Sequence, residues 1–221
     1  MTNQIAFQGA LGAYSDEACR SARPNMDPLP CQNFEEMIEA VRKGQADLAM
    51  VPVENSTYGR VADIHRLLPE SGLHIVDETF TRVQISLMAN PGTELEDVKA
   101  VRAHQVLLPQ ARNFLDQNGI EPINAADSAG AAAELARSPD PHSGVLASAI
   151  AAEIYGLNIL AQNIEDHGNN TTRFLIMSRE PNHTRRGDGK MMTTIVFQVR
   201  NIPAALYKAM GGFATNGVNM L

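Results

Sequence analysis

The chain begins with a short apolar run that a glycine-rich turn separates from a helical pattern. Residues 5–8 form the apolar run, and residues 9–12, with glycine at both ends, interrupt it. Ser15 then precedes Asp16 and Glu17, and acidic side chains favour the first turn of a helix because they lie at the positive end of its dipole. The pattern predicts a strand, a turn and a helix that begins at Ser15.

A second unit of the same kind follows. Asn33 is a suitable N-cap, and apolar residues recur after it at the i, i+3, i+4 and i+7 positions of one helical face, namely Phe34, Met37, Ile38 and Val41. Gly44 ends this helix, and residues 48–53 form the next apolar strand. Strands that alternate with helices in this way indicate a parallel sheet.

The alternation returns after residue 82. We expect strands at 83–88, 98–103 and 144–147, a turn at 90–92, and helices at 109–118 and 129–137. Asp127 and Ser128 are candidate N-caps of the last helix. Two α/β lobes follow, and ligands of open α/β sheets bind beyond the carboxyl ends of the strands. Asn55, Ser56 and Ser148 lie at such ends, so we expect a cleft between the lobes.

The composition is that of an ordinary globular protein. The 221 residues suffice for more than one domain, and the formal net charge of -7 argues against broad binding to nucleic acid or to an anionic membrane. No apolar run is long enough to span a bilayer, and the N-terminus lacks the basic and apolar regions of a secretion signal. We therefore expect a cytoplasmic protein that attracts anionic ligands only locally.

Cysteine and histidine patterns indicate neither a metal nor a disulfide scaffold. Only Cys19 and Cys31 are present, and the six histidines show no paired spacing that would place two ligands on one helical face. We expect buried, reduced thiols and no metal.

Two stretches place polar side chains directly at one end of an apolar strand. They are residues 168–177 (GNNTTRFLIM) and residues 47–59 (DLAMVPVENSTYG). Loops carried on a rigid scaffold concentrate binding and catalytic groups. The alternative is that Gly and Asn form ordinary turns here.

Together with three further stretches, these resemble the prephenate dehydratases, which convert prephenate into phenylpyruvate in phenylalanine biosynthesis. The resemblance covers roughly residues 4–180. The stretches that carry it are, in chain order, 9–15, 54–59, 104–110, 152–157 and 172–174. One tripeptide would be a weak signal, whereas five stretches in register are specific.

The resemblance implies a two-lobed, periplasmic-binding-protein-like (type II) α/β fold with its active site in the cleft between the lobes. It also implies no cofactor and a homodimer or homotetramer. The catalytic domain would span residues 1–180, with lobe 1 at about 1–81 and 165–180 and lobe 2 at about 82–164. Residues 181–190, rich in Pro, Asn, Gly and charge, would form a linker.

Residues 191–221 are similar to the opening strand and helix of an ACT domain, a regulatory module of α+β fold. We expect a strand at 193–199 and a helix at 204–213 that Asn201 and Pro203 begin. The later strands with the phenylalanine-binding segment are absent, so phenylalanine would be an allosteric effector only of a complete ACT domain. Because a strand and a helix bury little core, we expect this piece to be disordered, swapped or docked on a partner.

Aromatisation of prephenate requires a donor at the departing hydroxyl and a clamp for a carboxylate, but no redox cofactor. The resemblance makes Thr172 the partner of the leaving hydroxyl. A hydroxyl is a poor acid, so we expect Thr172 to stabilise developing negative charge, with Glu54 or His104 as candidate proton source. The alternative for Glu54 is a solvated carboxylate or a partner of an arginine.

Asn55 is the third catalytic candidate, beside Thr172 and Glu54. The predicted substrate-binding residues are Ser56, His104, Gln110, Thr171 and Arg173. Asn55 and Ser56 can present donors to a carboxylate, unless they form an Asx-type turn. Arg173 either clamps the substrate or forms an internal ion pair that positions Thr172, and Phe174 is expected in the core.

One segment departs from the family pattern. Ala103, Gln105 and Ala111 stand where the family usually has Ser, Pro and Cys, although His104 and Gln110 remain. We expect reduced or rearranged substrate binding rather than an inactive protein.

Two other functions fit the same pattern. A two-lobed cleft also describes a protein that binds an amino acid without chemistry, although the missing export signal weighs against it. A third reading keeps the catalysis but takes arogenate, whose amino group needs an added acceptor or a tolerant pocket. The sequence does not decide between prephenate and arogenate.

Overall fold

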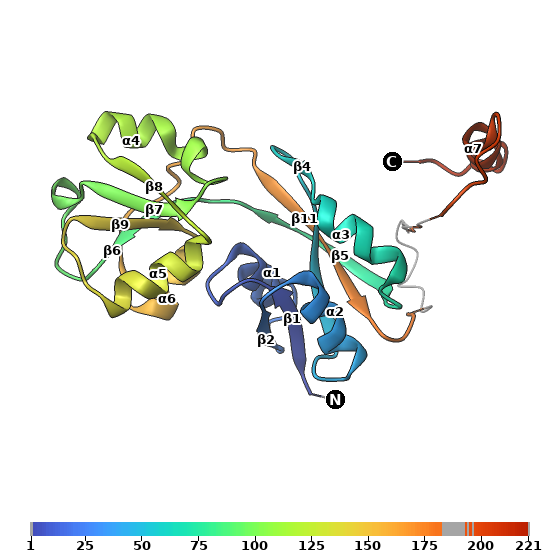
Figure 1. Cartoon of the computed structure of the whole chain (residues 1–221), viewed down its shortest axis with the longest axis horizontal. Helices are drawn as coiled ribbons and strands as arrows, with labels where there is room; N and C mark the ends of the chain where they lie inside the picture. The colour runs from blue at the N-terminus through green and yellow to red at the C-terminus, as the bar shows by residue number, and fades with distance from the viewer. Residues whose placement is uncertain (1, 183–192, 194, 196, 221) are drawn as a thin grey trace. The chain divides into compact units, whose positions relative to one another are not determined.

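The computed structural model describes residues 2–182, 193, 195 and 197–220. Contacts between residues divide the chain into a larger unit, residues 1–184, and a smaller unit, residues 185–221. The larger unit contains two separate sheets (Figure 1).

The first sheet combines strands from both ends of the larger unit. In spatial order it contains β2 (Asp27–Cys31), β1 (Gln4–Gln8), β3 (Leu48–Asn55), β11 (Thr171–Ser178) and β5 (His74–Arg82), with the short β4 (Gly59–Arg60) beside β3. β1 pairs in parallel with β2 and β3, whereas β11 is antiparallel to both of its neighbours. The predicted parallel pairing is confirmed for the first three strands, but β11 enters in the opposite direction as the chain returns from the second sheet.

Helices cover both faces of the first sheet. They are α1 (Tyr14–Ala22), α2 (Phe34–Arg42) and α3 (Ala62–Leu67), which a 3-10 turn (Leu68–Glu70) extends. Because side chains alternate along a strand, Phe7 and Phe174 pack on the side of α1, whereas Ala6 and Leu175 pack on the side of α2 and α3. Burial on both faces explains why β1 and β3 are nearly continuous apolar runs. Phe174 lies in the core as expected.

The second sheet is built entirely from the middle of the chain. In spatial order it contains β10 (Asn158–Ala161), β6 (Ser86–Ala89), β9 (Ser143–Ala147), β7 (Ala100–His104) and β8 (Glu121–Ala125), with α4 (Arg112–Asn118), α5 (Ser128–Arg137), α6 (Ala149–Tyr155) and 3-10 turns at Leu95–Asp97 and Leu108–Ala111. β7 is parallel to β8 and β9, and β6 is antiparallel to β9 and β10. Each sheet has its own buried clusters, so the predicted two-lobed α/β class is confirmed (Figure 1).

Local predictions are confirmed where one side chain caps a helix. Asn33 accepts the backbone N–H of Glu36 at 2.8 Å, and Asp127 accepts that of Gly130 at 2.6 Å. The predicted start of α1 is wrong, because Ala13 is its N-cap and Ser15 lies within its first turn.

Two boundaries in the second sheet also differ from the pattern. The strand predicted from residue 83 begins at Ser86, and the helix predicted at 109–118 begins with a 3-10 turn, so that α4 starts only at Arg112. Pro109 in that turn lacks the backbone N–H that a regular helix uses.

The smaller unit contains α7 (Ala205–Thr215). Its N-cap is Ala204, at a φ of 59°, so the predicted start at Asn201 and Pro203 is wrong. The described residues of the predicted strand, at 193, 195 and 197–199, form no strand; residues 194 and 196 lie outside the described residues, as do 183–190 of the predicted linker. Within the described ranges, no helix is long and apolar enough to cross a membrane.

Candidate active site

The pairing of β3 with β11 brings two of the predicted catalytic residues together. Asn55 and Thr172 are direct partners across the two strands. The side-chain amide of Asn55 donates to the Thr172 hydroxyl oxygen at 3.0 Å and to Asn170 Oδ1 at 2.6 Å. Both amide hydrogens of Asn55 are thereby used. The Thr172 oxygen acts as an acceptor, so its own O–H is available to donate, and no described residue accepts it.

An amide chain continues from this pair into the second lobe. The side chain of Asn170 is buried and donates to Gln110 Oε1, and Gln110 Nε2 donates to the carbonyl of Val106 at 2.7 Å. The Tyr58 hydroxyl donates to the same carbonyl at 2.7 Å. We call Thr172, Asn55, Asn170 and Gln110 the amide chain, because each of these side chains is bonded to the next.

Asn55 and Ser56 also hold the turns around them. Asn55 Oδ1 accepts the backbone N–H groups of Thr57 and Tyr58 at 2.9 and 3.0 Å, which is the Asx-type turn that the sequence left as an alternative. The Ser56 hydroxyl donates to the Asn169 carbonyl and accepts the Thr171 N–H, both at 2.9 Å. Ser56 therefore fastens the 169–171 turn to the end of β3.

Arg173 and Glu54 lie on the other face of the sheet. They are partners across the two strands, one position from the Asn55 and Thr172 pair, so their side chains point away from it. Arg173 forms an ion pair with Glu78, with Nε and Nη2 at 2.9 and 2.8 Å from one carboxylate oxygen. The structure thus does not bring Glu54 and Arg173 to Thr172, and it contains the internal ion pair that the sequence left open.

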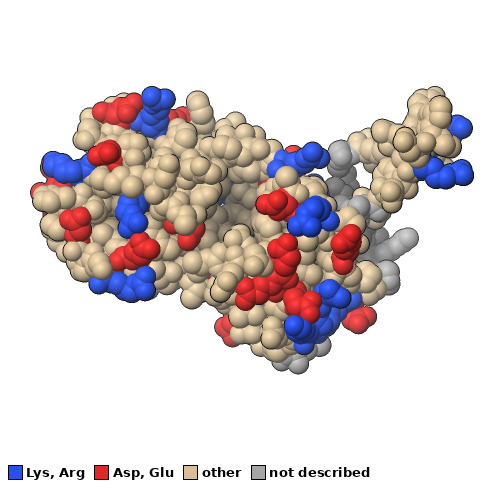
Figure 2. Space-filling view, in the orientation of Figure 1, with Lys and Arg blue, Asp and Glu red and all other residues tan. Residues whose placement is uncertain are grey.

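A cavity of about 280 Å³ lies between the two lobes. Its walls are residues 8–10 and 12–15 from the first lobe, and His104, Leu107, 126–129, 147 and 148 from the second. Figure 2 shows a hollow between the lobes whose walls are mostly uncharged. His104 connects the cavity to the amide chain, because its Nδ1 accepts the Val106 N–H at 3.3 Å.

The glycine-rich turn in the cavity wall is fixed from both lobes. Asp16, fully buried, accepts the Gly12 N–H at 2.8 Å and pairs with Arg20. The Ser148 hydroxyl donates to the Gly12 carbonyl at 2.7 Å. Gly12 has a φ of +86°, and a Cβ there would lie 2.9 Å from the Cα of Ala151, so only glycine fits without displacement.

Burial keeps two tyrosines near the cavity neutral. Burial raises the pKa of Tyr14 far above its ordinary range, and Glu17 and Glu165 raise it further. Its hydroxyl donates to the Gln84 carbonyl at 2.9 Å. Burial likewise raises the pKa of Tyr155, with Asp127 and Asp16 adding to the effect. Both residues therefore act as neutral hydrogen-bond donors.

Several of these residues were not among the predicted site residues. Asn170 belongs to the polar cluster at 168–177 but was given no role, and Asp16 was assigned only to the start of a helix. Asp127 and Ser128 were assigned only as caps, although both also line the cavity. Ligands of open α/β sheets bind beyond the carboxyl ends of the strands, and a helix cap that directly follows a strand lies at this same edge of the sheet. The position of Asp127 and Ser128 between a strand and a helix is therefore the sequence signal that could have identified them.

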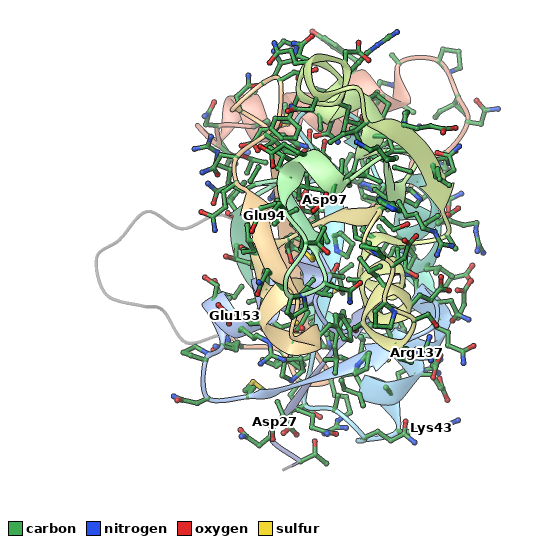
Figure 3. All side chains as sticks on the ribbon, turned by 90° about the vertical axis from the view of Figure 1, so that its left-hand side faces the viewer. Asp27, Lys43, Glu94, Asp97, Arg137 and Glu153 are labelled. Carbon is green, nitrogen blue, oxygen red and sulfur yellow. The ribbon has the colours of Figure 1, made fainter. Side chains whose placement is uncertain are left out.

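Among the described residues, neither a metal site nor a second, larger hollow coincides with this site. No group of three or more His, Cys, Asp or Glu side chains within the described ranges is placed to hold a metal ion. A larger hollow of about 510 Å³ is lined by Arg102, Glu134, Arg137 and neighbouring residues of the second lobe. Arg137 is labelled in Figure 3, at the end of α5. Of the predicted site residues, none lines this hollow, and His104 lines the smaller cavity. Thr172 and Asn55 do not line the smaller cavity themselves, so His104 is the residue on which we place the site there.

Comparisons with known proteins identify a family whose model covers all of the site residues described above. A family model described as prephenate dehydratase matches residues 5–182. A bifunctional N-acyl-homoserine lactone acylase/prephenate dehydratase from Komagataeibacter europaeus is 50% identical over 98% of this chain and 77% of its own length. Arogenate dehydratase/prephenate dehydratase 1 from Arabidopsis thaliana is 42% identical over 98% of this chain, which spans 55% of that protein.

A solved structure has the same fold over almost the whole chain. The crystal structure of prephenate dehydratase from Arthrobacter aurescens in complex with L-Phe has a TM-score of 0.83 at 28% identity, and the match covers 99% of this chain and 74% of that one.

Proposed function

Since the chain belongs to the prephenate dehydratase family, we propose that it catalyses the decarboxylating dehydration of prephenate to phenylpyruvate, a step of phenylalanine biosynthesis. The observation that supports this proposal most directly is the Thr172 hydroxyl, which Asn55 orients at 3.0 Å so that its O–H remains available. The same reaction on arogenate is the alternative, and the name of the Arabidopsis relative includes both substrates.

The reaction needs little from the protein besides positioning and charge stabilisation. The bond between the ring and its carboxylate breaks, and carbon dioxide leaves. The electron pair of that bond enters the ring and expels the hydroxyl group at the opposite carbon, which leaves as water after it takes up a proton. No electrons are gained or lost by the protein, and aromatisation of the ring drives the step.

We assign the leaving hydroxyl to Thr172. A threonine hydroxyl does not ionise near neutral pH, so it acts as a preorganised donor that stabilises negative charge on the departing oxygen. His104 is the better candidate for the proton source, because it lines the cavity whereas Glu54 lies on the opposite face of the sheet. With Nδ1 accepting the Val106 N–H, the neutral ring carries its hydrogen on Nε2, where it can donate a hydrogen bond to the departing oxygen. Transfer of a proton to that oxygen would require the imidazolium form, in which Nδ1 also carries a hydrogen and no longer accepts the Val106 N–H.

We assign supporting roles to the remaining predicted residues. Gln110 and Asn55 hold the amide chain in register, and Ser56 and Thr171 fix the turn that precedes Thr172. Arg173, paired with Glu78, positions β11 rather than clamping a carboxylate. Backbone N–H groups at the start of α1 are then the donors proposed for a substrate carboxylate.

The test is turnover by the purified chain. Prephenate and arogenate are supplied separately, and phenylpyruvate and phenylalanine are measured as the respective products. We expect turnover of at least one substrate, and we expect Thr172→Val to lower that turnover about 100-fold or more. Binding of either compound without turnover would instead support the amino-acid-binding protein that the sequence left as an alternative.

A second candidate activity is hydrolysis of N-acyl-homoserine lactones, because the Komagataeibacter relative carries that activity in its name at 50% identity. An acylase of the serine type needs a hydroxyl bonded to a base. Within the described ranges, no serine of the cavity donates to a histidine ring. The Ser148 hydroxyl donates to the Gly12 carbonyl, and the Ser128 hydroxyl accepts the backbone N–H of His104. We therefore favour the dehydratase, and release of homoserine lactone from an N-acyl substrate is the measurement that would revive the acylase.

A further inference from the structure

The cavity contains a carboxylate but no cationic lysine or arginine. Among the described residues that line it, Asp127 is the one acidic side chain, and Tyr14 and His104 are the other titratable groups. Prephenate brings two negative charges into this cavity. Arogenate carries an ammonium group in place of the ketone of prephenate, and a carboxylate attracts the ammonium but repels a dianion.

Asp127 has acceptor capacity beyond its capping role. It precedes α5, and its Oδ1 accepts the Gly130 N–H at 2.6 Å. An ionised carboxylate has about four acceptor positions on its two oxygens, so a helix cap leaves room for an ammonium group. Asp127 is exposed to solvent in the cavity wall, where a bound substrate can reach it.

The part of the cavity wall that comes from the first lobe contains backbone N–H donors, beside the acidic side chains Asp16 and Glu17 of the same helix turn. The turn at residues 12–15 leads into α1, a helix of nine residues whose N-cap, Ala13, supplies no side-chain acceptor. The first N–H groups of a helix lack partners within the helix and favour anions. An α-amino acid presents an ammonium and a carboxylate on one carbon, and this cavity holds an acceptor for the first and donors for the second.

We propose that Asp127 is a specificity-determining residue whose carboxylate binds the ammonium group of an α-amino acid substrate, arogenate, and so raises its use relative to the keto acid prephenate. The proposal rests on the proposed function, because it assumes that this cavity is the substrate site. It assigns to Asp127 the added acceptor that an amino substrate requires.

Asp127→Asn tests the proposal without removing the helix cap, since asparagine caps helices as well as aspartate does. We expect the ratio of kcat/KM on arogenate to kcat/KM on prephenate to fall roughly two- to fivefold, as for one solvent-exposed ion pair. Asp127→Ser, which also caps and is also neutral, should lower the ratio similarly. The melting temperature should stay within a few degrees of the wild type in both variants.

Glu153→Gln is the matched control. Glu153 is an exposed carboxylate on α6 of the same lobe (Figure 3), and it does not line the cavity. This variant removes the same charge from the protein, and the substrate ratio should not change. A similar fall in Glu153→Gln would mean that the net charge, not Asp127, sets the preference, and would overturn the proposal.

An unchanged ratio in Asp127→Asn, or an equal loss on both substrates, would also overturn it. Failure of the proposed function is a different result, in which the wild type turns over neither substrate. If the wild type turns over neither substrate, the affinities for arogenate and prephenate measured by calorimetry still test whether Asp127 binds the ammonium group. A selective loss of arogenate affinity in Asp127→Asn supports the assignment, and equal affinities in the two proteins refute it.

Discussion

The side-chain amide of Asn55 donates to the hydroxyl oxygen of Thr172 at 3.0 Å, between residues that face each other on the antiparallel strands β3 and β11. The two residues are 117 positions apart in the chain. A strand ladder rather than a mobile loop sets their distance, so the hydroxyl is oriented before a substrate arrives. Such preorganisation is what makes a weak donor effective at a charge that develops in the transition state.

Replacement of Thr172 should therefore affect the rate more than binding. We expect Thr172→Val, which keeps the shape but removes the hydroxyl, to lower kcat about 100-fold or more with a smaller change in KM. Steady-state kinetics on the better substrate measures both values. Thr172→Ser keeps the hydroxyl and should retain appreciable activity. A folded Thr172→Val enzyme with the wild-type kcat would refute the assignment.

Asn55→Asp separates the orientation of Thr172 from the turn that Asn55 also holds. The new carboxylate still accepts the Thr57 and Tyr58 N–H groups, but it has no hydrogen to donate and accepts the Thr172 O–H instead. The exchange also removes the hydrogen bond that buried Asn170 accepts at 2.6 Å, so we expect a large loss of kcat together with a smaller loss of stability, while the turn keeps its acceptor. Asn55→Ala should lose kcat and also about 1 kcal/mol of unfolding free energy, because the turn loses its acceptor.

The loss of kcat caused by Asn55→Asp should disappear once the Thr172 hydroxyl has been removed. In a double-mutant cycle, Asn55→Asp combined with Thr172→Val should be no slower than Thr172→Val alone, because both substitutions remove the same donor. Additive losses in kcat would show that Asn55 contacts the substrate independently of Thr172.

Helix caps and polar strand ends could be predicted from the sequence, whereas the face of the sheet to which each strand residue points could not. Asn33 and Asp127 were predicted as caps because a cap is decided by residues within one helical turn. The polar ends of β3 and β11 were predicted as candidate site positions because polar residues directly adjoin an apolar run there. Glu54 was included with Asn55 because both end the same strand, but adjacent residues of a strand point to opposite faces.

Long-range partners account for the rest. The sequence left open whether Arg173 clamps the substrate or forms an internal ion pair, because its partner, Glu78, lies 95 residues away on β5. Similarly, the role of Asn170 depends on Gln110 from the other lobe, and no periodicity relates the two. Such contacts depend on how the strands assemble, which the local pattern does not contain.

The Arg173 and Glu78 pair should contribute to stability and not to substrate binding. Both side chains are about a quarter exposed, so we expect Arg173→Ala and Glu78→Ala each to cost about 1 kcal/mol of unfolding free energy. The double variant should cost little more than either single one. Urea unfolding measures these values, and KM should stay close to the wild type. A raised KM in Arg173→Ala, together with an unchanged KM in Glu78→Ala, would restore the carboxylate clamp.

Gly12 should be sensitive because it lies where the two lobes touch, and Gly72 provides the control. Both glycines have a positive φ, of +86° and +67°, so alanine at either position incurs a backbone cost of roughly 1–2 kcal/mol. A Cβ on Gly72 meets nothing within 4 Å, whereas one on Gly12 lies 2.9 Å from the Ala151 Cα in the other lobe.

We therefore expect Gly12→Ala to lower the unfolding free energy more than Gly72→Ala does, and to raise KM as well. The added methyl group pushes the turn away from α6 and disturbs the hydrogen bond from Ser148 to the Gly12 carbonyl, which forms part of the cavity wall. Urea unfolding and steady-state kinetics on the two variants separate the contact from the backbone cost that they share. Equal losses of stability and equal KM values in the two variants would show that the Gly12 turn does not hold the lobes together.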